Sequence, residues 1–83
     1  MKFFYLRHKV SGDIIVADFD SNEEGSWVNL SFGGEGEQPY FGSVEELHKI
    51  LAGHMHDSWS YDIPSAVKKA IDNLQVEMKE VEL

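Results

Sequence analysis

The chain has 83 residues, of which 42% are apolar and 27% charged, and its formal net charge at pH 7 is −8. This length predicts one domain spanning residues 1–83, with little volume left for a deep active-site cavity. The aromatic and branched aliphatic content excludes a disordered chain, and the lack of cysteine excludes disulfides and thiolate metal sites.

Targeting signals are not evident in the sequence. The apolar runs are too short to cross a bilayer. The apolar stretch at the N-terminus is interrupted by Arg7, His8 and Lys9, and no small-residue cleavage site follows it, which argues against a signal peptide. We therefore expect a cytoplasmic protein with no membrane partner.

Residues 2–10 and 13–20 are rich in aromatic and β-branched residues, and Ser11-Gly12 lies between them. A two-residue loop containing glycine predicts a β-hairpin in which Val10 faces Asp13. This register gathers most of the apolar side chains on one face, together with His8. The predicted core face consists of Phe4, Leu6, Val10, Ile15, Ala17 and Phe19.

Residues 26–32 alternate between apolar and polar and predict a third, half-buried strand, with Trp27 on its outer face. A helix is expected over residues 44–52, because Ser43 and Glu46 have the spacing of a capping box and Gly53 is suited to end it. Residues 53–62 have no clear periodicity, and we interpret them as a connecting loop.

A second helix is predicted to begin near Pro64. Its expected buried face consists of Ala66, Val67, Ala70, Ile71 and Leu74. Residues 75–82 fit either a continuation of this helix or a strand with a bulge; we favour the strand, because it would cover an open sheet edge. The predicted fold is therefore α+β, with an antiparallel sheet of three strands in sequence order, a fourth C-terminal strand, and two helices packed on one face.

The charges are unevenly distributed along the chain. No Lys or Arg occurs between Lys9 and Lys49, whereas this interval contains nine acidic residues. Such a field repels nucleic acid and anionic membranes and attracts cationic partners. The alternative interpretation is that the acidic surface serves solubility alone.

The segment FGGEGEQPYFG, residues 32–42, follows the third predicted strand. Phosphate binding is not expected here, because no GK[ST] follows the glycines and both charged residues are acids, Glu35 and Glu37. We interpret the segment either as a flexible connection or as an interaction loop. In the second case Tyr40 and Phe41 would supply contact area and the glutamates would attract a basic partner.

Sequence patterns for metal binding and catalysis are weak. Asp18, Asp20 and Asn22 have the spacing that opens a calcium loop, but Glu23 stands where that loop requires glycine. The histidines at positions 48, 54 and 56 could in principle bind zinc, although their spacing matches no known motif. Ser58 and Ser60 lie near a histidine in sequence only, which does not make a catalytic triad. We expect no cofactor and no enzymatic activity.

The leading hypothesis is a non-enzymatic binding protein that docks on a basic, nucleic-acid-binding surface of a partner protein. The residues expected to bind this partner are Asp18, Asp20, Glu23, Glu24, Glu35, Glu37, Tyr40 and Phe41. In size and acidity the chain resembles small phage-encoded inhibitors, including DNA mimics; this resemblance is compositional and covers no motif. The alternatives are a homo-oligomeric structural domain that uses an outer face with Tyr5 and Trp27, and a histidine-dependent metal-binding domain.

Overall fold

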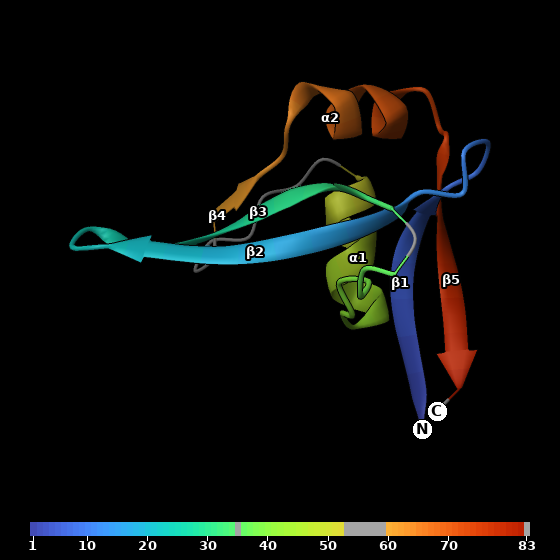
Figure 1. Cartoon of the computed structure of the whole chain (residues 1–83), viewed down its shortest axis with the longest axis horizontal. Coiled ribbons are helices and arrows are strands. Elements are labelled where there is room, and N and C mark those ends of the chain that lie inside the picture. The colour runs from blue at the N-terminus through green and yellow to red at the C-terminus, as the bar shows by residue number, and fades with distance from the viewer. Residues whose placement is uncertain (35, 53–59, 83) are drawn as a thin grey trace.

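The computed structural model describes residues 1–34, 36–52 and 60–82, and for residues 60–62 it describes the backbone alone. These ranges contain five strands and two helices in an α+β fold (Figure 1). In chain order the elements are β1 (Lys2–His8), β2 (Ile14–Asn22), β3 (Gly25–Gly33), α1 (Val44–Leu51), β4 (Ser60–Asp62), α2 (Ser65–Asp72) and β5 (Val76–Glu82). Neither helix has the length or apolar character needed to span a membrane.

The strands form one sheet in the order β4-β3-β2-β1-β5. All neighbours are antiparallel except β3 and β4, which are parallel. The predicted C-terminal strand is confirmed, and it pairs with β1 in a regular register from Lys2 opposite Glu82 to His8 opposite Val76. The bulge expected in this strand is wrong, because that unbroken register places Val76 and Val81 on opposite faces of the sheet.

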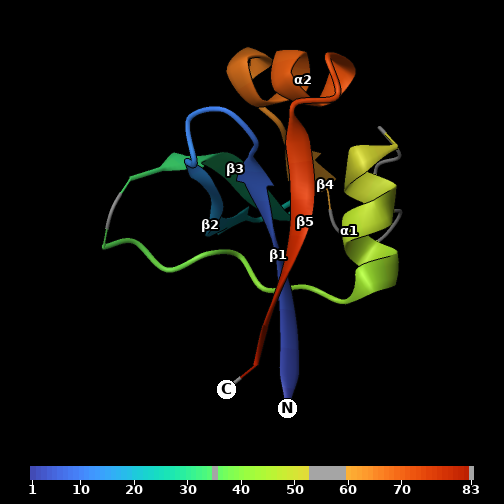
Figure 2. The same ribbon diagram turned by 90° about the vertical axis from the view of Figure 1, so that its right-hand side faces the viewer.

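The sheet is sharply bent between β1 and β2. Their strand pairing is confined to Arg7 opposite Ile14, and from there β2 and β3 run away from β1 and β5 (Figure 1). Residues 40–42 connect the diverging strands: the Tyr40 N–H donates to the Ile15 carbonyl at 2.9 Å, and the Gly42 N–H donates to the Phe4 carbonyl at 3.1 Å. Figure 2 shows this segment passing β1 on its way to α1.

The loop of the first hairpin differs from the prediction. The His8 N–H donates to the Asp13 carbonyl at 2.7 Å, so the loop has four residues, 9–12, in place of two. Nδ1 of His8 explains the longer loop, because it accepts hydrogen bonds from the N–H groups of Val10 at 3.1 Å and Ser11 at 3.2 Å. The register moves by two residues, and each side chain therefore keeps its predicted face.

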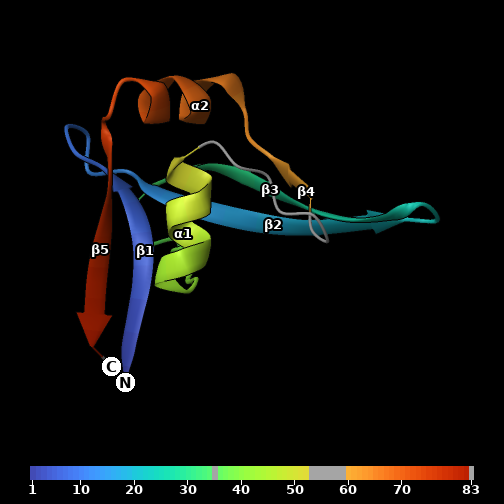
Figure 3. The ribbon, with the colours of Figure 1, turned by 180° about the vertical axis from the view of Figure 1, so that it is seen from behind.

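Both helices contribute to the same core as the sheet. The fully buried side chains are Leu6, Ile15, Val28, Leu30, Leu47, Ile50 and Val67, and Ala70, Ile71 and Val76 join the same cluster. Viewed from behind, α1 lies beside β1, and α2 lies near the start of β5 (Figure 3). At the start of α1, Ser43 Oγ accepts from the Glu46 N–H at 3.1 Å, which confirms the predicted N-cap.

Several residues predicted to be buried are exposed. Val10 lies in the loop of the first hairpin and is 79% exposed, and Phe19 lies beyond the core and is 67% exposed. Ala66 is exposed on α2. Leu74 is also exposed, because α2 ends at Asp72 and Leu74 adopts a left-handed conformation with φ 57° just after it.

The short strand β4 lies where the sequence predicts a loop. Its three residues pair with Trp27, Val28 and Asn29 of β3. A three-residue strand is too short to show an alternating pattern, and its parallel pairing depends on a distant segment. The predicted stop of the first helix at Gly53 lies outside the described residues.

Candidate functional site

The far half of the β2–β3 hairpin projects from the rest of the molecule (Figure 1). Residues 18–26 are all exposed, and we call this segment the acidic hairpin. It contains Asp18, Asp20, Glu23 and Glu24 and no Lys or Arg. The structure therefore gathers four of the predicted partner-binding residues on one projection.

The turn of the acidic hairpin places two carboxylates at its tip. Asn22 pairs with Gly25, which leaves Glu23 and Glu24 as the two turn residues. Oδ1 of Asn22 accepts from the Glu24 N–H at 2.8 Å. An Asn side chain that bonds to the backbone two residues on is a common way to form a tight turn.

The two aspartates lie on the outer face of the hairpin. Asp18 is opposite Asn29 and Asp20 is opposite Trp27. Residues two apart on a strand are separated by about 6.8 Å and share a face. Because Asp18, Asp20 and Asn22 lie along an extended strand, they cannot wrap around a calcium ion.

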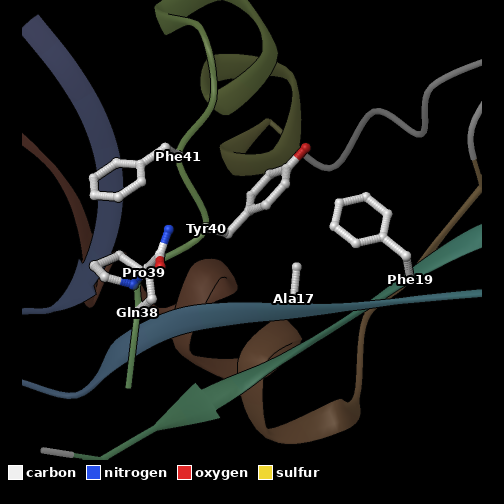
Figure 4. A pocket seen from close by; sticks show the side chains of 6 residues that line it. All are labelled: Ala17, Phe19, Gln38, Pro39, Tyr40 and Phe41. Atoms are coloured by element: carbon white, nitrogen blue, oxygen red, sulfur yellow. The ribbon is translucent and has the colours of Figure 1, made fainter. Parts of the chain in front are cut away.

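An aromatic groove lies on the other side of β2, at the root of the acidic hairpin (Figure 4). It has a volume of about 420 Å³ and is lined by Ala17, Phe19, Gln38, Pro39, Tyr40 and Phe41. The rings of Phe19 and Tyr40 have centroids 6.4 Å apart and are tilted by 57°. The Tyr40 hydroxyl donates a hydrogen bond to the Glu46 carboxylate, so Tyr40 is held between β2 and α1.

The two predicted aromatic anchors point in different directions. In Figure 4 the Tyr40 ring lies toward Phe19 and Ala17, whereas the Phe41 ring points away from them. Phe41 instead contacts Phe3 and Tyr5 of β1, with ring centroids 5.5 and 6.1 Å apart. Tyr40 therefore belongs to the same side as Phe19, and Phe41 mainly packs on the outer face of β1.

The predicted glutamates of the glycine-rich loop do not join the acidic hairpin. Glu35 lies outside the described residues. Glu37 is exposed and lies close to Gly33, which pairs with the first residue of β2, whereas Glu23 follows the last one. These positions are about 27 Å apart along the strand.

The glycine-rich loop borders a second hollow of about 410 Å³ beside the loop of the first hairpin. Its charged side chains are the carboxylates of Asp13 and Glu37. Two acids at this position oppose the binding of a phosphate group.

The histidine hypothesis remains a prediction. His48 is exposed on α1, and His54 and His56 lie outside the described residues, as do Ser58 and Trp59. Within the ranges that the structure describes, no group of three His, Asp or Glu side chains is arranged to hold a metal ion.

Comparison with known proteins adds no relative. The chain matches no family model, no curated protein and no solved structure. The site is therefore interpreted from its own geometry.

Sequence reasoning missed Phe19 as a site residue and assigned it to the core. Its position between two aspartates was not a signal, because a polar neighbour on each side is also normal for a buried residue of an alternating strand. The groove itself had no sequence signal, since it depends on the backbone hydrogen bond between Tyr40 and Ile15.

Proposed function

We propose that this protein is a non-enzymatic binding protein that inserts its acidic hairpin into a basic surface of a partner protein. The observation that supports the proposal is the projection of four carboxylates, without a single base, from a sheet whose strands β1 and β5 carry equal numbers of bases and acids. A projecting two-stranded ribbon can enter a concave surface that a flat acidic face could only cover. Its charge would accelerate association and select for cationic partners.

The partner surface that best fits this shape is a nucleic-acid-binding groove. Such grooves are lined with Lys and Arg that normally contact phosphates. The carboxylates of Asp18 and Asp20 on one face and those of Glu23 and Glu24 at the tip would occupy phosphate positions. The protein would then act as an inhibitor that competes with nucleic acid, as a DNA mimic does.

Reversal of charge at the tip tests this proposal. The test variant is Glu23→Lys/Glu24→Lys, and the matched control is Glu80→Lys/Glu82→Lys on β5, which changes the net charge by the same amount far from the hairpin. Each protein is used as bait in host lysate with stepped salt elution, and captured proteins are then tested for competition with their own nucleic acid.

We expect the wild type and the β5 control to retain a basic partner to moderate salt, and the tip variant to release it at low salt. The captured partner should lose its nucleic acid when the wild-type protein is added. Equal retention by all three baits would show that the hairpin is not the binding site. A partner that keeps its nucleic acid would argue against inhibition by mimicry.

A homodimer is the second candidate, and the outer face of the sheet favours it. Tyr5 and Trp27 are half-buried there, and Tyr5 belongs to an aromatic cluster with Phe3 and Phe41. In this proposal the two helices cover the inner face of the sheet, and the outer face contacts the same face of a second copy in a symmetric dimer. Sedimentation at several concentrations tests it: a single monomeric species up to about 0.1 mM would exclude a dimer tighter than micromolar.

A further inference from the structure

We infer that the free edge of β5 pairs with the same edge of a second copy of this chain, in an antiparallel register centred on Met78. The sheet order ends at β5, and no other described strand or helix lies beyond it in Figures 1 and 3. This contact differs from the outer-face dimer because it joins two strand edges into one continuous sheet. It does not depend on the acidic hairpin, which projects away from β5 (Figure 1).

The backbone of β5 presents alternate residues to this edge. The Lys9 N–H donates to the Gln75 carbonyl at 2.7 Å, and these two residues continue the register in which β1 and β5 pair. Hydrogen-bonded and non-hydrogen-bonded pairs alternate along an antiparallel ladder, so the odd-numbered residues of β5 bond to β1. The even-numbered residues, from Val76 to Glu82, therefore direct their N–H and C=O groups toward the free edge.

The charges of β5 exclude most symmetric registers. A two-fold axis must place even-numbered residues opposite even-numbered ones, because only these have groups at the edge. An axis through any charged residue of β5 would place that charge opposite itself, which is unfavourable. An axis through Val81 would place the glutamates on either side of it opposite each other, and an axis through Val76 would leave most of the strand unpaired.

An axis through Met78 suits the backbone and the apolar side chains. Val76 of one copy then faces Glu80 of the other, and each pair of facing even-numbered residues exchanges two N–H···O=C bonds. Met78 lies opposite the buried Leu6 on the inner face of the sheet and packs partly against the core cluster. Contact between the two Met78 side chains would bury more of this half-exposed residue.

The outer face of β5 supplies the charge complementarity of this register. Lys79 is half-buried and forms no ion pair with any acid that the structure describes. In the dimer it lies opposite Glu77 of the second copy, which is itself paired with Arg7 at 3.3 Å. Symmetry makes this pair twice, and each gives a row of charges of alternating sign across the interface. Charges on an edge strand usually discourage pairing, but here they permit one register and oppose the others.

Sedimentation equilibrium between about 0.02 and 1 mM protein measures the association. One strand pair is smaller than a standard interface of about 1,200 Å² or more, so we expect a weak dimer with a Kd on the order of 0.1 mM. Lys79→Glu, and separately Glu77→Lys, should weaken it by roughly tenfold or more, because each variant places like charges opposite each other twice. The matched control is Lys68→Glu on the exposed side of α2, which should dimerise as the wild type does.

A mixture of the two edge variants tests the register. Lys79→Glu leaves two acids at these positions and Glu77→Lys leaves two bases, so one copy of each restores both pairs of opposite charge. The equimolar mixture should therefore associate about as tightly as the wild type, although neither variant does so alone. A mixture that associates no better than its components would overturn the inference. Urea unfolding of each variant checks that both are folded.

Amide hydrogen exchange of the wild type distinguishes this contact from the outer-face dimer without any mutation. Between about 0.02 and 1 mM, the N–H groups of Val76, Met78 and Glu80 should exchange roughly fourfold more slowly as the monomer is depleted. The N–H groups of Glu77 and Lys79 already bond to β1 and should not change. A chain that stays monomeric at about 1 mM, or a dimer whose edge amides exchange at an unchanged rate, would overturn the inference.

Discussion

The bent sheet has two arms, one formed by β1 and β5 and the other by β2 and β3, and their charges are distributed differently. Strands β1 and β5 carry three bases and three acids, and two ion pairs join them, Lys2 to Glu80 at 3.1 Å and Arg7 to Glu77 at 3.3 Å. The β2–β3 hairpin carries four acids, two on β2 and two in its turn, and no base. Paired charges make a sheet edge soluble at little energetic cost, whereas like charges on a projecting hairpin repel one another and contribute nothing to packing. This difference is the basis of the proposal that the acidic hairpin binds a partner.

The first prediction compares the stability lost on mutating a buried side chain of β1 with that lost on mutating an exposed side chain of the acidic hairpin. Leu6 on β1 is 1% exposed, and Leu6→Ala should lower the free energy of unfolding by about 2–5 kcal/mol through lost burial and a cavity. Phe19→Leu on the acidic hairpin should cost less than about 1 kcal/mol, because the side chain is mostly exposed. Urea unfolding measures both, and comparable losses would show that the hairpin is as tightly integrated as β1.

The second prediction tests whether the β2–β3 arm is closely packed at Gly33, the last residue of β3. A Cβ on Gly33 would lie 2.6 Å from Val16 Cγ1 and 2.4 Å from Glu37 Oε2, whereas nothing lies within 4 Å of a Cβ on Gly34. Gly33→Ala should therefore destabilise the protein by about 1–3 kcal/mol through overpacking.

Gly34→Ala is the matched control for this change. It should be neutral or stabilise the protein by up to about 0.5–1 kcal/mol through reduced chain entropy in the unfolded state. Equal midpoints of thermal unfolding for the two variants would contradict the close packing at Gly33.

The third prediction measures the charge pairing of the other arm. Arg7 and Glu77 face each other across β1 and β5 with side chains 37% and 31% exposed. A double-mutant cycle with Arg7→Gln and Glu77→Gln should give a favourable coupling of about 0.2–1 kcal/mol that decreases as salt is added. A coupling of zero at low salt would show that these charges serve solubility alone.

The smallest expected effect is that of the hairpin charges on stability. Neutralising all four acids, by Asp18→Asn, Asp20→Asn, Glu23→Gln and Glu24→Gln, should raise the stability by a few tenths of a kcal/mol at low salt, since it removes like-charge repulsion. The gain should disappear at high salt, as followed by urea unfolding. A clear loss of stability at low salt would mean that these carboxylates hold the hairpin together, which would weaken the argument that they are kept for a partner.

Much of the architecture follows from local patterns in the sequence. The alternation in residues 26–32 predicts β3, and the spacing of Ser43 and Glu46 predicts the start of α1. The C-terminal pattern fits a helix or a strand, and β5 is predicted because a strand there would cover an open sheet edge. Alternation assigns a residue to a face, however, and says nothing of how far that face extends over the core. Phe19 is accordingly on its predicted face and yet exposed.

The remaining features depend on contacts that local patterns do not contain. The loop of the first hairpin is lengthened by one imidazole nitrogen of His8, and β4 exists only through its pairing with β3. Of the candidate site, the acids of the hairpin were predictable from composition. The groove was not, because residues 40–42 are positioned by hydrogen bonds to two strands that diverge.

The pairing of β1 with β5 also determines when the molecule can fold. It joins residues 2–8 to residues 76–82, a separation close to the full length of the chain described. Such non-local pairing slows folding, typically to milliseconds or seconds, because the long loop must close before its contacts contribute. During synthesis the apolar face of β1 must wait for β5 to emerge, and the positive charges of Lys2 and Arg7 on β1 would protect this strand against wrong pairing in that interval.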